Sequence, residues 1–404
     1  MNLRIISPMP YICCMEQFPD RLNKKLKERE ANNALRTLTS VDGKIDFCSN
    51  DYLGFAKNEK LFSKVSEYLK GHNLTANGSS GSRLLSGNSE LCESTEQMIA
   101  DYYDSEAALI FNSGYDANLG FFGSVPQKGD LILYDELIHA SIRDGIGMSH
   151  AQGYKFKHNN LADLQKWLEL ASSQRLNNNG AAVYIVTESV FSMAGDSPDI
   201  KSMIALARQF GAYLVVDEAH AVGVFGKSGS GLLESIGLQH AVFARIVTFG
   251  KALGAHGAAI LGSKNLIQYL LNFARSFIYT TALPPHSLVT IREAHNLLKE
   301  NLGQEKRDLL HKNIAYFKAR IKELGFPGAF VESESAIQSC ILSDNTAVKQ
   351  AARNIQDKGI DVRPILAPTV PAGKERIRLI LHSFNSKKEI DAVLKLLFEL
   401  WIKR

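Results

Sequence analysis

Short apolar runs alternate with helical patterns through the middle of the chain. The runs are four to six residues long, which is too short for helices, and they are bounded by polar residues or glycine. Alternating strands and helices are typical of an α/β fold, in which helices cover both faces of a largely parallel sheet. We predict strands at residues 108–111, 131–134, 182–187, 213–217, 245–249 and 258–261, and helices notably at 89–103, 163–171 and 200–209.

The two ends of the chain carry other patterns, and the pair Pro284-Pro285 marks the break between the middle and the last part. We predict a first helix over about 19–38, a strand at 44–48, a helix over 287–324, strands near 336–342 and 376–381, and a closing helix at 387–401. The chain is therefore divided into an N-terminal segment (1–48), a large domain (49–284) and a smaller α+β C-terminal domain (285–404).

Composition excludes several classes of protein. The 404 residues have a formal net charge of +4, without a run of like charges or aromatic–basic interleaving, so we expect no nucleic-acid binding. No apolar stretch is long enough to span a membrane, and Pro8 and Pro10 interrupt the first residues where a signal peptide would need an apolar core. We expect a cytoplasmic protein that does not bind membranes.

The five cysteines, Cys13, Cys14, Cys48, Cys92 and Cys340, are odd in number. They form no Cys-x-x-Cys motif and no Cys/His spacing of a metal site. We expect free thiols in a reducing compartment and no metal centre.

An apolar run, the predicted strand 245–249, ends in Gly250-Lys251, so that Lys251 lies among small residues at a strand end. Burying an ammonium group is costly unless it is paired or neutralised. A lysine that loses its proton easily is suited to Schiff-base chemistry, because the amine must be neutral before it attacks a carbonyl. The alternative is an ordinary surface lysine in a turn.

A second apolar strand ends in Asp217, and His220 follows three residues later. Open α/β sheets bind ligands at the carboxyl ends of their strands. A buried aspartate there needs a cationic or donor partner, such as a protonated pyridine nitrogen. The alternative is that Asp217 only caps a helix. Asp217, His220 and Lys251 together favour one shared site.

Three further strands end in candidate residues. Gly114 opens a predicted helix, where backbone N–H groups could bind a phosphate. His139 could stack on a flat ring or be a core histidine, and Ser192 belongs to the same edge of the sheet. In the turn-rich segment 49–54, Asn50 could bind a ligand or form an Asx-turn.

Arg376 and Arg378 share one face of the predicted strand 376–381, and Ile377 and Leu379 occupy the other. An arginine on that face could hold a carboxylate by two hydrogen bonds. The alternative is an exposed strand face.

Several motifs together resemble the α-oxoamine synthases, which are pyridoxal-phosphate (PLP) transferases of fold type I. The resemblance extends from about Arg36 to the C-terminus and implies a mostly parallel central sheet with a smaller C-terminal domain. The motifs are Ser49-Asn-Asp-Tyr-Leu-Gly54, Gly81-Ser-Arg-Leu84, His139-Ala-Ser141, Asp217-Glu-Ala-His220 and Thr248-Phe-Gly-Lys-Ala-Leu-Gly254. Residues 33–36, 277–284 and 368–373 resemble the biotin-pathway branch of the family.

The resemblance implies catalytic roles for four residues. Lys251 would bind PLP covalently, and Asp217 would pair with its pyridine nitrogen. His220, together with Ser192, would donate to the ring oxygen, and His139 would stack on the ring.

The resemblance also implies a phosphate site formed by the amides of Gly114 and Tyr115 with Thr248. Thr280 or Thr281 would complete this site from a second subunit, so the family pattern implies a homodimer with shared active sites.

Five residues match substrate positions of the family. Asn50 and Arg378 would hold the amino acid, Arg378 by its carboxylate. Arg36 and Thr369 match substrate contacts of the biotin-pathway branch, and Arg363 is a further candidate.

The implied reaction is the decarboxylative condensation of L-alanine with a pimeloyl thioester of CoA or a carrier protein, with Lys251 as the general base. One alternative is a sister enzyme that uses glycine and acetyl-CoA. Another is a catalytically silent partner subunit, which would be expected to lack the lysine.

Three positions depart from the family pattern. Ile138 replaces a polar residue, Ala194 replaces an aspartate, and residues 382–384 differ near the expected carboxylate site. None of them is assigned to covalent chemistry.

Overall fold

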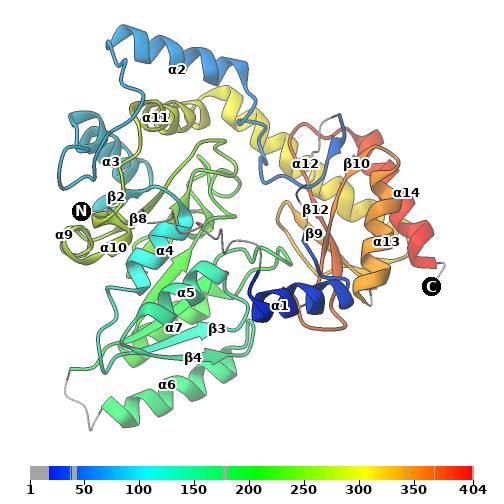
Figure 1. Cartoon of the computed structure of the whole chain (residues 1–404), viewed down its shortest axis with the longest axis horizontal. Coiled ribbons are helices and arrows are strands. Elements are labelled where there is room, and N and C mark those ends of the chain that lie inside the picture. The colour runs from blue at the N-terminus through cyan, green and yellow to red at the C-terminus, as the bar shows by residue number, and fades with distance from the viewer. Residues whose placement is uncertain are drawn as a thin grey trace, which may run out of the picture.

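The computed structural model describes residues 18–36, 38, 43–175, 180–342, 344–367 and 369–402. Its largest sheet has seven strands, in the order β2-β8-β7-β6-β5-β3-β4. Figure 1 shows this sheet on the left, with the C-terminal part of the chain on the right. The strand β8 is antiparallel to both of its neighbours, and the other pairings are parallel. These strands are β2 (Ala107–Phe111), β3 (Leu131–Asp135), β4 (Gln152–Phe156), β5 (Val183–Glu188), β6 (Tyr213–Asp217), β7 (Ala244–Thr248) and β8 (Ala258–Gly262).

All six strands predicted for this region are confirmed, each within one residue at either end. Both faces of the sheet are buried, which explains the continuous apolar runs. In β5, for example, Val183 and Ile185 pack into one core cluster and Tyr184 and Val186 into another. The edge strand β4 was not predicted, because it is mostly exposed and has no apolar run.

Helices cover both faces of this sheet. Residues of α4, α9 and α10 pack in one core cluster, and residues of α6 and α7 pack in another on the opposite face. The helices of this part are α2 (Glu59–Gly71), α3 (Glu90–Tyr102), α4 (Gly114–Phe122), α5 (Ala140–Met148), α6 (Leu161–Arg175), α7 (Ile200–Phe210), α8 (Leu232–Ser235), α9 (Lys264–Phe273) and α10 (Arg275–Ile278).

The C-terminal part forms a three-stranded antiparallel sheet with helices beside it, in the order β11-β12-β9. Its strands are β9 (Ile337–Ile341), β10 (Ile360–Asp361), β11 (Arg363–Ile365) and β12 (Arg376–Ile380), of which β10 lies outside the three-stranded sheet. Its helices are α11 (Pro285–Lys299), α12 (Asn301–Leu324), the short 3-10 helix η1 (Pro327–Ala329), α13 (Asn345–Gln356) and α14 (Lys387–Ile402).

The N-terminal segment contains α1 (Asp20–Ala31) and β1 (Ile45–Asp46). The strand β1 pairs in parallel with β10, so this segment is joined to the C-terminal part of the chain. The predicted domain boundaries at 48 and 284 stay predictions.

Two helix predictions differ from the structure, the first in its end and the second in its continuity. The first helix ends at Ala31, and Asn33 has a φ of 50°, so Leu35 lies beyond it. The predicted helix 287–324 is two helices, because Glu300 between them is extended. Its carboxylate forms ion pairs with Lys60 and Lys64 of α2. Among the described helices, none combines the length and the apolar character needed to cross a membrane.

Candidate active site

A cavity of about 270 Å³ lies at the carboxyl ends of β6 and β7, beside the first turn of α4. It brings together residues that are up to about 200 positions apart in the chain, as the strand-end argument predicts. The predicted site residues that line it are Asn50, Gly114, Tyr115, His139, Asp217, His220, Thr248 and Lys251.

One end of the cavity is suited to an anion. Gly114 is the first residue of α4, so its N–H and that of Tyr115 belong to the helix end without intrahelical acceptors. A Cβ at Gly114 would lie 2.5 Å from Cγ2 of Thr248, so a side chain here would collide with β7. The Thr248 hydroxyl is buried and makes no hydrogen bond to any residue that the structure describes.

Thr280 and Thr281 lie next to this end but do not line the cavity. The side chain of Asn112, two residues before Gly114, donates to Oγ1 of Thr280 at 3.0 Å and to the Thr281 carbonyl at 2.8 Å. Their contribution to a second subunit's phosphate site stays a prediction.

Asp217 lines the same cavity and is 6% exposed at the end of β6. Its Oδ1 accepts from the Ala219 N–H at 2.9 Å, and its Oδ2 accepts from Nδ2 of Asn118 at 3.0 Å. Nδ2 of Asn118 also donates to the Ser141 hydroxyl at 3.0 Å. The carboxylate is therefore fixed by neutral donors. The alternative that Asp217 only caps a helix is not what the structure shows, because its contacts are with the following turn and with Asn118.

His139 lines the cavity, and its contacts determine which ring nitrogen carries the proton. Its Nδ1 accepts from the Ser141 N–H at 3.2 Å and lies 2.8 Å from the Ser141 hydroxyl. Because Nδ1 accepts, the ring proton of the neutral form is on Nε2. Burial lowers the pKa of His139, which favours this neutral form.

Glu188 was not predicted, although it lines the cavity at the end of the fully buried strand β5. Its Oε1 accepts from the backbone N–H of His139 at 2.5 Å. Burial and the neighbouring Asp217 raise the pKa of Glu188 to about 8. The argument that selected Asp217, an acidic residue at the end of a buried strand, applies equally to Glu188 and would have found it.

Lys251 faces the cavity, and its Nζ lies 2.8 Å from Nε2 of His220. The alternative of an ordinary surface lysine is wrong, because Lys251 is only partly exposed and its amine is directed at His220 in the cavity. Burial also lowers the pKa of Lys251 to about 8. Burial and the adjacent Lys251 lower the pKa of His220 well below its usual value, so His220 is neutral and accepts from the lysine. The amine is thus easily deprotonated near neutral pH.

A line of hydrogen bonds continues from His220 to the C-terminal sheet. Nδ1 of His220 lies 2.6 Å from the Tyr52 hydroxyl, which in turn donates to Oδ1 of Asn50 at 3.4 Å. The same Oδ1 accepts from Nη2 of Arg378 at 2.9 Å. Tyr52 was not predicted; its partner His220 is 168 positions away, which no local pattern reveals.

The arginine-bearing face of β12 is covered. Nε of Arg378 donates to the Ser192 carbonyl at 2.7 Å, and Arg376 is 7% exposed. The alternative of an exposed strand face is therefore wrong. Ser192 lies beside the cavity without lining it, so the hydrogen bond of its hydroxyl to the ring oxygen stays a prediction.

A second cavity, of about 670 Å³, contains the remaining candidates Arg36, Arg363 and Thr369. Arg363 is the direct cross-strand partner of Arg378, and Met193, next to Ser192, lines this cavity too. The two cavities are therefore neighbours. Three more cations line the second cavity and were not predicted: Arg29, Lys349 and Arg353.

His382, at one of the departures from the family pattern, lies behind the segment 49–54. Its Nε2 lies 2.9 Å from the Ser49 carbonyl, and its ring stacks on Phe384. It lines neither cavity. The substitution thus affects the support of Asn50 and leaves the cavity wall unchanged.

Comparisons with known proteins agree with this geometry. Residues 42–397 match the family model of the aminotransferases of class I and II. The 8-amino-7-oxononanoate synthase of Emericella nidulans is 40% identical over 396 residues, which cover 95% of this chain and 96% of that protein. A PLP–myriocin aldimine complex of serine palmitoyltransferase from S. paucimobilis has a TM-score of 0.83 at 28% identity and covers 95% of this chain and 97% of that one. The 8-amino-7-oxononanoate synthase of Francisella tularensis has a TM-score of 0.74 at 28% identity and covers 90% and 98%.

Proposed function

The chain belongs to the aminotransferase class I and II family, and we propose that it catalyses the reaction of an 8-amino-7-oxononanoate synthase in biotin biosynthesis. In this reaction L-alanine and a pimeloyl thioester condense to 8-amino-7-oxononanoate, with release of CO₂ and the thiol. One observation carries the proposal. Lys251, Asp217, His220 and His139 line a single cavity in a chain that is 40% identical to such an enzyme over nearly its whole length.

The residues of the cavity fit PLP. The amides of Gly114 and Tyr115 and the unpaired hydroxyl of Thr248 provide donors for a phosphate. Asp217 supplies the carboxylate for a protonated pyridine nitrogen, and Lys251 supplies the amine for the aldehyde. When bound, PLP would act as an electron sink for the carbanion of the amino acid.

Lys251 would hold the cofactor and, once its amine is released, would remove the α-proton of the amino acid at Nζ. With a pKa of about 8, this amine is available in its neutral form near physiological pH. His220 accepts from Nζ through Nε2 at 2.8 Å, so it orients the amine toward the cavity without competing for the proton.

Arg378 and Asn50 are positioned to bind the carboxylate of L-alanine. Arg378 is half-buried and is held by the Ser192 carbonyl and by Asn50, so its guanidinium is already oriented. A preoriented guanidinium binds a carboxylate more strongly than a flexible one, because less side-chain entropy is lost.

The second cavity is suited to the acyl substrate. Its lining includes five cations and, among the described residues, no aspartate or glutamate. The distal carboxylate of a pimeloyl group needs a cation, and Arg36 and Arg363 are available for it, with Thr369 as a further contact. Both CoA and a carrier protein could deliver the thioester.

We also propose a cytoplasmic homodimer with shared active sites. Thr280 and Thr281 lie beside the phosphate end without lining the cavity of their own chain, which supports a role in the partner's site. The substrates are small molecules, with the carrier protein as the possible exception.

The proposal predicts selectivity for the amino acid. Free-thiol release from pimeloyl-CoA should occur with L-alanine and be at least about tenfold slower with glycine or L-serine, because a pocket discriminates one methyl or hydroxyl group by about 1–3 kcal/mol. Turnover with glycine in preference to alanine would assign the protein to a sister reaction. No release from pimeloyl-CoA with any of the three would contradict the proposal.

Arg36→Ala is expected to raise the KM for pimeloyl-CoA by about tenfold or more, because a charge-assisted hydrogen bond to the distal carboxylate contributes about 1.5–3 kcal/mol. The KM for L-alanine should stay unchanged, because Arg36 lines only the second cavity. Arg208→Ala, an exposed arginine in α7, is the matched control. An unchanged KM for pimeloyl-CoA would show that Arg36 does not bind the acyl chain.

A further inference from the structure

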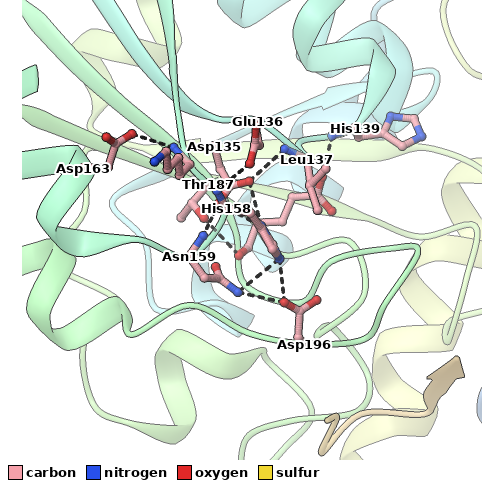
Figure 2. A network of polar contacts seen from close by, with 11 residues as sticks. Asp135, Glu136, Leu137, His139, His158, Asn159, Asp163, Thr187 and Asp196 are labelled. Carbon is pink, nitrogen blue, oxygen red and sulfur yellow. Dashed lines mark hydrogen bonds and ion pairs between the residues drawn. The ribbon is translucent and has the colours of Figure 1, made fainter. Parts of the chain in front are cut away.

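A histidine outside both cavities bridges two carboxylates next to the candidate active site, as Figure 2 shows. Nδ1 of His158 lies 2.9 Å from Oδ1 of Asp135, and its Nε2 lies 2.7 Å from Oδ2 of Asp196. The side chain of His158 is 21% exposed and that of Asp135 is fully buried. The ring stands edge-on to Phe191, with 4.5 Å between the centroids.

The contacts determine the charge of this histidine. Carboxylate oxygens only accept hydrogen bonds, so both ring nitrogens of His158 must carry a proton, and the ring is an imidazolium. Burial alone lowers the pKa of His158, but the hydrogen bonds to Asp135 and Asp196 outweigh it and raise the pKa to about 9. The bridge is therefore intact at neutral pH.

The Asp135 end of the bridge leads to His139. Asp135 is the last residue of β3, and its Oδ1 also accepts from the Leu137 N–H at 2.8 Å. The Ile138 N–H donates to the Asp135 carbonyl at 3.2 Å, which closes the turn before His139. The direction in which His139 enters the cavity thus depends on how the Asp135 carboxylate is held.

The Asp196 end leads to Arg378. The Asp196 carbonyl accepts from the Phe191 N–H at 2.9 Å and so closes the loop 191–196. In this loop the Ser192 carbonyl accepts from Nε of Arg378 at 2.7 Å, and the Met193 carbonyl accepts from the Ser339 hydroxyl at 2.7 Å. The loop 191–196 therefore holds Arg378 of the C-terminal sheet in place.

We propose that His158 is a positioning residue. It would hold the turn that carries His139 and the loop 191–196, which binds Arg378, at a fixed distance from each other. The two groups that it positions would contact opposite parts of the bound reactants, the cofactor ring and the carboxylate of the amino acid. A shift of about 1 Å in such groups can slow a reaction about a hundredfold. The inference rests on the proposed function for the roles of His139 and Arg378 and for the choice of PLP, L-alanine and pimeloyl-CoA in the test.

Other charged groups surround the bridge and bear on its titration. Oε1 of Glu136 accepts from the His158 N–H at 3.1 Å, and Oδ2 of Asp163 in α6 accepts from the Lys157 N–H at 2.8 Å. Arg376 of β12 interacts electrostatically with Asp196. Besides Asp135 and Asp196, the charged side chains around the ring are therefore Glu136, Asp163 and Arg376. The negative charges of Glu136 and Asp163 favour the protonated form of His158.

The test compares His158→Gln and Asp196→Asn in the PLP-loaded enzyme. Glutamine has one amide that cannot bridge two carboxylates, and asparagine keeps the shape of Asp196 while removing its charge. His240→Gln is the matched control, because His240 forms an exposed pair with Asp104 far from either cavity. If His158→Gln does not fold, Asp196→Asn alone decides the test.

Both variants should raise the KM for L-alanine by about tenfold or more and change the KM for pimeloyl-CoA by a clearly smaller factor, because the loop 191–196 contributes only Met193 to the lining of the second cavity. The visible circular dichroism per bound PLP should also weaken, because it reports the asymmetry of the ring's surroundings. The control should match the wild type in all three measurements.

Equal changes in both KM values, or wild-type values of the alanine KM and the circular dichroism, would overturn the proposal and leave His158 a purely structural residue. The circular dichroism needs no acyl substrate. A weakened signal in both variants would therefore support the positioning role even if pimeloyl-CoA proved not to be the substrate.

Discussion

Replacing Lys251 by alanine is expected to lower the rate of thiol release from pimeloyl-CoA and L-alanine by at least roughly a thousandfold, because general-base catalysis alone contributes about 10²–10⁴ and covalent binding of PLP is lost as well. No other lysine lines the cavity among the residues that the structure describes, so no neighbouring amine can replace it. The fold should persist, since the side chain lines the cavity and its hydrogen bond is to another cavity residue, His220.

The measurement for this prediction is thiol release by the variant beside Lys395→Ala, an exposed lysine in α14 that should behave as the wild type. Borohydride should fix PLP to the wild-type chain and bleach its yellow colour, and the variant should retain no label. Labelling of the wild type would also exclude a silent partner subunit. A variant that keeps more than a trace of the rate would contradict the role of Lys251.

Asp217→Asn is expected to have the second largest effect, a fall in kcat of roughly a hundredfold or more, because preorganised charges at a developing charge are typically worth 10²–10³. The amide keeps the size of the side chain, but it has one acceptor oxygen for two donors, the Ala219 N–H and Nδ2 of Asn118, and it cannot stabilise a protonated pyridine nitrogen. The electron sink would then be weaker, while the KM for pimeloyl-CoA should change little.

Asp217→Asn should have a second, independent consequence. Asp217 contributes to the raised pKa of Glu188, so its neutralisation should lower that pKa below about 8. Asp101→Asn, an exposed residue of α3, is the control for kinetics. A kcat within a factor of a few of the wild type would show that Asp217 is not the partner of the pyridine nitrogen.

Strand ends could be predicted from the sequence because they follow from one rule. Apolar runs mark the buried strands, and their carboxyl ends gather at one edge of a mostly parallel sheet. Asp217, His220 and Lys251 were expected in one site by this rule and line one cavity, and Glu188 satisfies the rule as well. The family resemblance added the remaining roles, which rest on motifs and on no local physical pattern.

Residues with distant partners could not be predicted. Asn118 lies within α4 and reaches Asp217, 99 positions away, and Tyr52 lies in a turn and reaches His220. Neither has a local signal, because a polar residue in a helix or turn is ordinarily solvated. His158 likewise acquires its two carboxylates from the end of β3 and from the loop 191–196, and only the folded chain brings them to its ring.

The break between α11 and α12 was not predicted for a related reason. The helical pattern runs through Glu300 without interruption, and what separates α11 from α12 is an extended backbone whose side chain pairs with α2. Tertiary contacts decided the break there, while local propensity predicted continuity.

The central claim is that this cavity joins L-alanine to a pimeloyl group with loss of the alanine carboxyl group. The most direct test supplies L-[1-¹³C]alanine and pimeloyl-CoA to the PLP-loaded protein and measures ¹³CO₂, free thiol and product together. Equal amounts of labelled CO₂ and thiol, with 8-amino-7-oxononanoate as the product by mass spectrometry, are the predicted result. Thiol release without labelled CO₂, or no release of either, would contradict the account.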